Sequence, residues 1–97
     1  MKVHENHMGQ KVVAVSDPEI LSKHIEDSDK GIEMTVSKEF YGDHEFDIKE
    51  VMQFISHSEN VNVVGNRIVE TLIENGIIEP KNVIMIGGIK HAQIYSI

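Results

Sequence analysis

The residues with the clearest chemical potential lie near the end of the 97-residue chain, where a double glycine precedes three side chains with polar tips. These residues are Gly87, Gly88, His91, Gln93 and Tyr95. Because alternate residues of a strand point to the same face, a strand from Ile89 to Ile97 places the three polar side chains on one face and Ala92 and Ile94 on the other. A double glycine beside such a row allows a ligand or a partner to approach the backbone closely. The pattern predicts either a binding surface or the solvent face of an edge strand, and it is not a catalytic signature.

His91 has the chemistry of a general base, but a base also needs a reacting group and an orienting partner. Gln93 and Tyr95 can bind or orient a ligand without being strong acids or nucleophiles. The chain shows no Ser/His/Asp order and no pair of carboxylates whose spacing singles them out. The sequence therefore favours a non-catalytic protein, with an enzyme as the second hypothesis.

A second candidate site lies where the segment Val61–Gly65 precedes an expected helix. The free N–H groups at the start of a helix can bind an oxyanion. However, neither glycine-rich phosphate motif is present, and Arg67 is the nearby positive charge. A glycine needed for close packing or a tight turn is the favoured interpretation. The alternative is a site for a small anionic ligand, in which the fold brings Asn62, Gly65 and Arg67 close to His91.

Six histidines raise the question of a metal site. His4 and His7 are three residues apart on an expected strand and turn, so in a regular strand they face opposite sides. Two imidazoles bind zinc more readily at the i, i+4 spacing of a helix. His24 and His57 stand singly near the ends of two expected helices, which is typical of capping or surface histidines. We therefore expect no metal site, and the sequence contains no cofactor motif.

The composition is that of an ordinary globular protein, with 40% hydrophobic and 26% charged residues. A chain of 97 residues suffices for one domain, residues 1–97, and not for two. The absence of cysteine excludes disulfides, thiolate zinc sites and thiol catalysis, and it fits a reducing compartment. The N-terminus shows no secretory signal, and no apolar run is long enough to cross a membrane. We therefore expect a cytoplasmic protein without membrane contact.

The net charge of −7 is concentrated in the middle of the chain. Residues 26–50 contain nine acidic residues against three lysines. A protein that binds a phosphate backbone usually has a basic patch, and the sequence shows none. We therefore expect no direct binding to nucleic acid. The acidic segment is interpreted as a solvated surface, with a face for a basic partner as the alternative.

Three helices are expected. The first begins at Asp17–Pro18, because an acceptor at the N-cap and a proline at the first helical position favour a helix start. Its apolar stripe consists of Ile20, Leu21 and Ile25. The second begins at Asp47, with Glu50 three residues later as in a capping box. The third is capped by Asn66 and ends at Asn75–Gly76.

Strands and turns fill the remaining segments. Two N-terminal strands form a hairpin, and Val12–Val15 lacks polar alternation, which predicts a strand buried on both faces. Alternation over Ile32–Ser37 predicts a half-buried strand. Phe40–Asp43 is expected as a turn, Asn60–Gly65 fits either a short strand or a loop, and two strands close the chain. The expected fold is a small α+β (mixed α/β) domain with the order β-β-α-β-α-α-β-β.

Several short motifs together resemble those of a small archaeal family, domain-of-unknown-function family 424. The motifs are Gly9–Asp17, Glu19–Leu21, Phe40–Gly42, Asn62–Gly65 and Gly88–Gln93. The most specific of them are Asn-x-Val-Gly and His-Ala-Gln, and the resemblance spans nearly the whole chain. The chain departs from the family pattern at Gln10 and Asn66, where glutamate is common, at Ser16, where cysteine is common, and at Lys90, where proline is common. The resemblance implies an archaeal, cytoplasmic, single-domain protein, and it implies no established reaction.

Three functions are compatible with the sequence. The first is a non-catalytic binding or interaction module that uses the Gly87–Gly88 turn and the face formed by His91, Gln93 and Tyr95 to bind a protein. The second is a small-ligand or anion-binding protein, or an enzyme, that uses His91 near a glycine-bearing helix N-terminus. The third is an accessory protein of the archaeal translation apparatus, which would dock on a basic protein because its own charge opposes binding to RNA.

Overall fold

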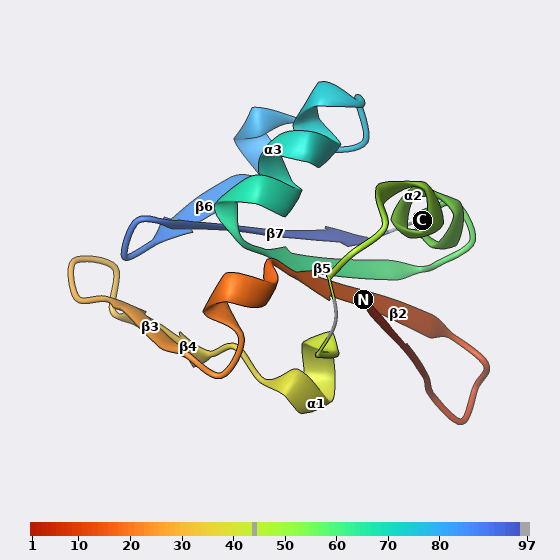
Figure 1. The fold of residues 1–97 in the computed structure, drawn as a ribbon, viewed down its shortest axis with the longest axis horizontal. Helices are drawn as coiled ribbons and strands as arrows, with labels where there is room; N and C mark the ends of the chain where they lie inside the picture. The colour runs from red at the N-terminus through yellow and green to blue at the C-terminus, as the bar shows by residue number, and fades with distance from the viewer. Residues whose placement is uncertain (44, 96–97) are drawn as a thin grey trace.

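Residues 1–43 and 45–95 are described by the computed structural model, in which a central sheet is covered on both faces (Figure 1). The sheet has five strands in the order β1-β2-β5-β7-β6, and β3 and β4 form a separate hairpin. The strands are β1 (Lys2–Glu5), β2 (Lys11–Ser16), β3 (His24–Asp27), β4 (Ile32–Thr35), β5 (Asn60–Val64), β6 (Val83–Ile86) and β7 (Ile89–Tyr95). The helices are α1 (Lys38–Tyr41), α2 (Ile48–Ile55) and α3 (Asn66–Glu74), with single 3₁₀ turns at Pro18–Ile20 and Pro80–Asn82. The expected α+β class is confirmed, and none of the described helices is long and apolar enough to cross a membrane.

Strand β2 lies inside the sheet, as its sequence predicts. It pairs antiparallel with β1 and parallel with β5, while β7 pairs antiparallel with both β5 and β6. Val13 and Val15 belong to the core on one face of the sheet, and Ala14 belongs to the core on the other. The lack of polar alternation in this strand therefore follows from burial on both faces.

The two faces of the sheet are covered by different elements (Figure 1). Helices α2 and α3 lie on one face, where Val51, Ile68 and Leu72 pack against the valines of β2 and β5. The Pro18–Ile20 turn, α1 and the β3–β4 hairpin lie on the other face, around a smaller cluster of buried residues. These buried residues are Ala14, Val36, Tyr41 and Val64.

The prediction of a helix that begins at Asp17 is wrong. Pro18–Ile20 forms a single 3₁₀ turn, and the chain then continues into strand β3, which pairs with β4. The three apolar residues assigned to the helical stripe all pack against the smaller core cluster, so their spacing reflects burial and not a helical period. The Asp17 side chain makes no capping bond to the turn that follows it, because its two carboxylate oxygens accept hydrogen bonds from α3.

Several other local predictions are confirmed. The Asp47 side chain accepts hydrogen bonds from the first turn of α2. Helix α3 ends at Glu74 and is followed by Asn75 and Gly76 as expected, with Gly76 at a left-handed φ of 71°. The N–H of Ile77 donates to the carbonyl of Leu72, which completes a Schellman motif. The segment that fitted a strand or a loop is strand β5.

Two further local predictions need correction, and one falls partly outside the described residues. Phe40 and Tyr41 belong to the short helix α1 and not to an open turn. Gly65, and not Asn66, occupies the N-cap position of α3. The last strand is observed to Tyr95, and its expected continuation to Ile97 lies outside the described part of the chain.

The interior position of β2 predicts the effect of a core truncation. Val13→Ala should lower the free energy of unfolding by about 1–3 kcal/mol, because it removes methyl groups from a fully buried side chain. Urea unfolding curves measure this loss. The control is Met8→Ala at a side chain that is 72% exposed, where we expect a change of less than about 0.5 kcal/mol. Equal effects of the two substitutions would contradict the position of β2.

Candidate functional site

Strand β7 presents the expected polar residues on the less extensively covered face of the sheet. In the register of the sheet, Gln93 stands beside Asn62, Tyr95 beside Asn60, and His91 beside Ile84 of β6. Because side chains alternate along a strand, these residues share one face, which we call the open sheet face. It consists of Asn60, Asn62, Ile84, His91, Gln93 and Tyr95. Ile84 and Tyr95 are 45% and 64% exposed, so part of this face is accessible to a partner.

A hydrogen-bonded cluster joins this face to helix α1. The hydroxyl of Tyr41 donates to Oδ1 of Asn62 at 2.6 Å, and Nε2 of His91 lies 3.2 Å from the same oxygen. Because this carboxamide oxygen can only accept, Nε2 of His91 carries the proton in this contact. Burial lowers the pKa of His91, and burial raises the pKa of Tyr41 to about 12. Both groups are therefore neutral near pH 7, and the cluster offers hydrogen bonds without charge.

A cavity opens at the end of the open sheet face. It measures about 320 Å³ and lies between the β1–β2 turn, the start of β5 and the end of β7. Its lining residues are Asn6, Gln10, Lys11, Val12, Glu59, Asn60 and Tyr95. Oδ1 of Asn60 is buried, and it has no hydrogen-bond partner among the described residues. Buried polar atoms nearly always have a partner, so this oxygen is an acceptor left unused at the wall of the cavity.

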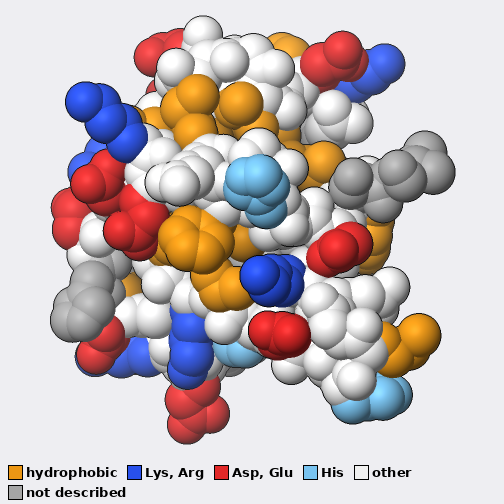
Figure 2. Space-filling view, turned by 90° about the vertical axis from the view of Figure 1, so that its right-hand side faces the viewer, with side chains coloured by type: hydrophobic (Ala, Val, Ile, Leu, Met, Phe, Trp, Pro, Cys, Tyr) orange, Lys and Arg blue, Asp and Glu red, His pale blue; other side chains and the backbone are white. Residues whose placement is uncertain are grey.

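A smaller hollow lies beside α2. It has a volume of about 180 Å³ and is lined by Lys11, Gln53, Phe54, His57 and Ser58. Figure 2 shows the side of the molecule that carries the β1–β2 turn and α2, where hydrophobic side chains gather near a histidine and among charges of both signs. The small volume of this hollow and its single lysine identify no class of ligand.

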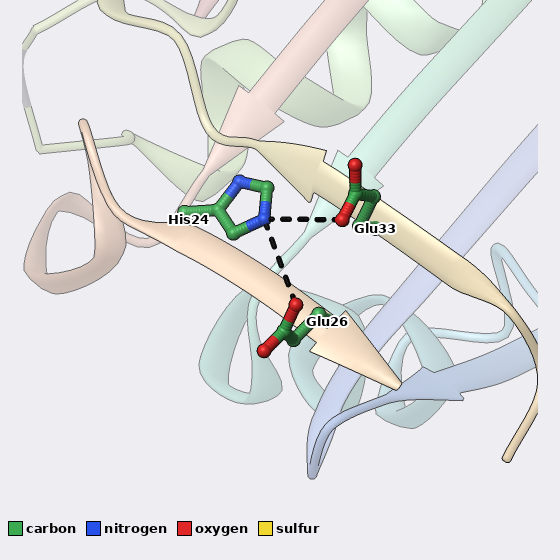
Figure 3. Close-up of side chains that lie close together, drawn as sticks. All are labelled: His24, Glu26 and Glu33. Carbon is green, nitrogen blue, oxygen red and sulfur yellow. Dashed lines mark ion pairs between the residues drawn. The ribbon is translucent and has the colours of Figure 1, made fainter. Parts of the chain in front are cut away.

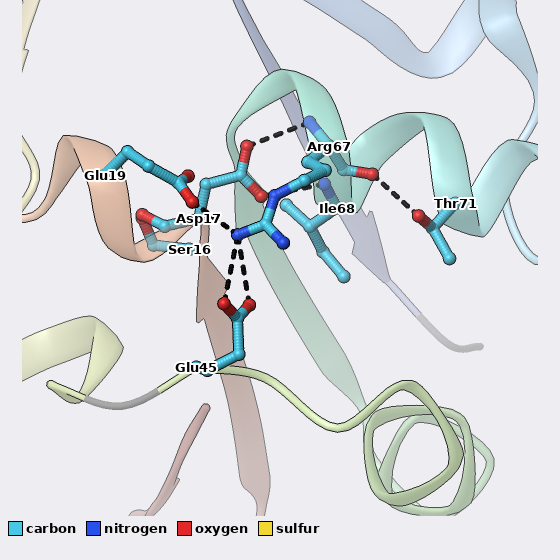
Figure 4. Close-up of polar contacts among 7 residues, drawn as sticks. All are labelled: Ser16, Asp17, Glu19, Glu45, Arg67, Ile68 and Thr71. Atoms are coloured by element: carbon cyan, nitrogen blue, oxygen red, sulfur yellow. Dashed lines mark hydrogen bonds and ion pairs between the residues drawn. The ribbon is translucent and has the colours of Figure 1, made fainter.

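The N-terminus of α3, which the sequence offers as an anion site, is occupied by a carboxylate of the chain itself (Figure 4). Oδ2 of Asp17 accepts from the N–H of Arg67 at 2.8 Å, and Oδ1 accepts from the N–H of Ile68 at 2.9 Å. Gly65 has a φ of +127°, and a Cβ atom there would lie 2.5 Å from the Asp17 carboxyl carbon. Burial raises the pKa of Asp17, although these two N–H groups and the Arg67 charge partly oppose the shift. The close approach of the Asp17 carboxylate therefore explains why residue 65 is a glycine.

Arg67 is also engaged within the chain. Its Nη2 lies 2.6 Å from a carboxylate oxygen of Glu19 and 3.0 Å from one of Glu45, and its guanidinium stacks 5.3 Å from the ring centre of Phe46. The hydrogen bond to Glu45 raises the pKa of Arg67 further. Two carboxylates share this positive charge, so Arg67 does not provide a free anion site. The backbone of Gly65 does lie beside β7, because its N–H donates to the carbonyl of Lys90 at 2.8 Å.

Gly87, the first residue of the double glycine, is required by packing within the chain. Gly87 has a left-handed φ of 56°, and a Cβ there would overlap the carbonyl oxygen of Glu26 in β3. Its N–H donates to Oδ2 of Asp27 at 3.3 Å. The backbone that approaches Gly87 closely therefore belongs to the β3–β4 hairpin and not to a ligand. Gly88 has open space at the corresponding position, and its carbonyl accepts from the side chain of Asn66.

Potential metal ligands gather away from the open sheet face, on the outer side of the β3–β4 hairpin (Figure 3). His24, Glu26 and Glu33 each place one ligand atom within 4.8 Å of the other two. The spacing of the histidines did not predict this group, because it forms only when two strands pair.

The roles of Asp17, Tyr41 and Asn60 were not predicted from the sequence. The sequence does contain a pattern that indicates a polar role for Asn60. Asparagine alternates with valine at the start of Asn60–Val64, which predicts one polar face for that strand. No sequence pattern indicates the role of Tyr41, because its hydrogen-bond partner Asn62 lies 21 residues away in sequence. For Asp17 the local pattern was correct for a helix cap but did not show which helix it caps.

Comparison with known proteins places the chain among proteins of unknown function. Residues 4–97 match the model of a family described as "Protein of unknown function (DUF424)". A similar solved structure is the crystal structure of an uncharacterized conserved protein from Methanopyrus kandleri, with 19% sequence identity and a TM-score of 0.76. The similarity covers 97% of this chain and 87% of that chain, and at this identity it shows a shared fold. No curated protein matches the sequence.

The contact of Asp17 with α3 predicts a large effect of its removal. Asp17→Ala should lower the free energy of unfolding by about 2 kcal/mol or more, because it removes a helix cap and leaves the buried N–H of Ile68 without an acceptor. Asp17→Asn keeps one acceptor oxygen and should lose less. Chemical denaturation measures both variants, with Asp29→Ala at an exposed acid as the control. A similar loss for Asp17→Ala and Asp29→Ala would contradict the cap.

The burial of His91 predicts a specific dependence of stability on pH. Because the folded-state pKa is lowered, the unfolded chain binds the proton first as the pH falls. The contribution of His91 to stability is therefore present above about pH 6.5 and is lost as the pH falls below that value. An NMR titration of the His91 ring should give a pKa below 6.5. The stability lost on acidification from about pH 7.5 to 5.5 should be smaller in His91→Gln, and an equal loss in both proteins would contradict burial of the neutral ring.

Proposed function

The chain belongs to the DUF424 family, and we propose that it is a non-catalytic binding module whose open sheet face docks a peptide segment of a partner protein. The support comes from the composition of that face. None of its six residues is Asp, Glu, Lys or Arg, although the chain as a whole has a net charge of −7. The cores of protein interfaces are depleted in charge and enriched in aromatic residues such as tyrosine.

The observation that carries the proposal is the unpartnered oxygen of Asn60. A buried acceptor without a donor costs the folded protein about 1–3 kcal/mol. Rotation of the Asn60 side chain toward the adjacent cavity would let a donor from a bound segment satisfy this oxygen. A peptide backbone supplies N–H donors at the spacing of a strand, and one of its side chains can pack on the exposed ring of Tyr95. The 320 Å³ cavity beside both residues offers room for such a side chain. A peptide with an uncharged central segment is the occupant that fits these features.

We further propose that the partner is a protein and not a nucleic acid or a membrane, and that binding takes place in the cytoplasm. Lys30, Arg67, Lys81 and Lys90 each lie within ion-pair distance of a carboxylate of the chain. The chain has 16 acidic residues against nine Lys and Arg residues, and this excess of negative charge opposes binding to a phosphate backbone or an anionic lipid surface. The lack of cysteine fits a reducing compartment.

The test is a selection of peptides from a random display library on the purified protein, followed by measurement of the Kd of the selected peptides. Gln93→Arg places a charge on the open sheet face, and Tyr95→Ala removes its exposed ring. Each should weaken binding at least about tenfold, while the melting temperature changes little because both side chains are exposed. The control is Glu74→Arg on α3, which covers the other face of the sheet and should leave the Kd unchanged.

Asn60→Val separates binding from folding most sharply. It removes the unpartnered oxygen and adds a residue suited to a strand, so the free protein should melt at the same or a higher temperature while peptide binding weakens. A labelled single-stranded RNA should not bind at physiological salt. Peptides that bind Gln93→Arg and Tyr95→Ala as well as the native protein would contradict the proposal, and so would RNA binding that falls steeply with salt.

A further inference from the structure

We propose that the outer side of the β3–β4 hairpin is a binding site for a divalent transition cation of the Zn²⁺ class, held by His24, Glu26 and Glu33 (Figure 3). The register of the hairpin creates the site. Glu26 of β3 stands directly opposite Glu33 of β4, and His24 stands opposite Thr35. Residues two apart on a strand share a face, so all four side chains lie on one side of the hairpin.

The distances among the ligand atoms are close to those of a metal centre. Nε2 of His24 lies 3.6 Å from a carboxylate oxygen of Glu33 and 3.9 Å from one of Glu26. Ligand atoms about 2.0–2.1 Å from a tetrahedral Zn²⁺ are roughly 3.3 Å apart, so small rotations of the side chains suffice to close the site. The side chains can make these rotations because His24 is 51% exposed and both glutamates are 70% exposed.

Thr35 orients the imidazole of His24 through a hydrogen bond to the ring nitrogen that does not face the glutamates. Nδ1 of His24 lies 3.1 Å from the hydroxyl oxygen of Thr35. When Nδ1–H donates to this oxygen, Nε2 is left unprotonated and faces the two carboxylates (Figure 3). A metal ion binds an unprotonated ring nitrogen, so the hydrogen bond to Thr35 favours the tautomer in which Nε2 can bind the cation.

An ordinary surface ion pair accounts less well for this arrangement. Like charges directly opposite each other on paired strands are destabilising. Among the described residues, His24 is the one basic group within ion-pair distance of Glu26 or Glu33, so at most one positive charge stands against the two carboxylates. Lys30 lies in the same hairpin, but it pairs with Asp27 and donates to the carbonyl of Met85. A dication between the two glutamates would convert their repulsion into attraction to a common centre.

The donor set selects the class of cation. One imidazole nitrogen and two carboxylates suit Zn²⁺ and neighbouring transition metals, whereas Ca²⁺ and Mg²⁺ prefer oxygen ligands alone. Three protein ligands leave a fourth position for water. The bound cation would also link β3 to β4, which form a sheet of only two strands and are marginally stable as an isolated pair.

The test is a titration of Zn²⁺ into the ¹⁵N-labelled full chain at neutral pH, with the affinity measured by calorimetry. Saturable shifts should be confined to β3, β4 and their immediate neighbours, with a stoichiometry of one. His24→Ala and Glu33→Gln should each weaken binding at least about tenfold. Thr35→Val should weaken it several-fold while it leaves all three ligands in place. The spectrum of each variant without Zn²⁺ shows whether its fold is intact.

The matched control is His7→Ala, an exposed histidine in the β1–β2 turn, which should leave the affinity for Zn²⁺ unchanged. Mg²⁺ and Ca²⁺ at the same concentrations should give no saturable shifts. The proposal is overturned if the hairpin shows no saturable shifts up to about 1 mM Zn²⁺. It is also overturned if folded His24→Ala and Glu33→Gln retain the native affinity, or if His7→Ala loses binding to the same extent.

Discussion

The carboxylate of Asp17 makes the contact on which the rest of this fold depends, because it joins the end of β2 to the start of α3 across 50 residues of sequence. The parallel pairing of β2 and β5 brings it there, and the N–H of Asp17 extends that pairing by donating to the carbonyl of Val64 at 3.2 Å. In sheets with parallel strands, the crevice at their carboxyl ends beside a helix N-terminus is where ligands ordinarily bind. In this chain an internal carboxylate fills that crevice, and Gly65 has no side chain because one would overlap it. The same contact therefore organises the fold and occupies its most evident ligand site.

This internal cap changes what the remaining surface can recognise. The positive end of α3 is bound to Asp17, and the guanidinium of Arg67 is bound to Glu19 and Glu45, so neither offers charge to a ligand. The open sheet face instead presents the neutral groups of His91 and Asn62, and the hydroxyl of the buried Tyr41 donates to Asn62. Recognition by such a face depends on hydrogen-bond geometry and apolar packing. Long-range electrostatic attraction, which accelerates association, would have to come from charges outside it.

The parts of the structure that the sequence predicts are those whose cause is local. The cap of α2 at Asp47, the glycine stop of α3 at Gly76 and the burial of Val13–Val15 all follow from neighbouring residues. The segment after Asp17 was misassigned because its cap signal is genuine but serves a helix far along the chain. The sequence does not predict the group formed by His24 and the two glutamates, since this group exists only in the register of paired strands. The sequence alone does not determine whether Asn62 and Gly65 lie near β7, and the pairing of β5 with β7 brings them there.

The two proposed sites are joined through the β6–β7 turn but are held in place by different interactions. The hairpin contacts this turn through the bond from Gly87 to Asp27, and Lys30 binds the carbonyl of Met85 in β6. Strand β7, however, is paired with β5 from His91 to Tyr95 on one side and with β6 from Ile89 to Ala92 on the other. The positions of Gln93 and Tyr95 are therefore set by the β5 ladder, at the end of β7 that lies away from the turn. A cation on the hairpin makes no differential contact with the docked and free states of this face, so the structure favours two sites whose occupancies are thermodynamically independent.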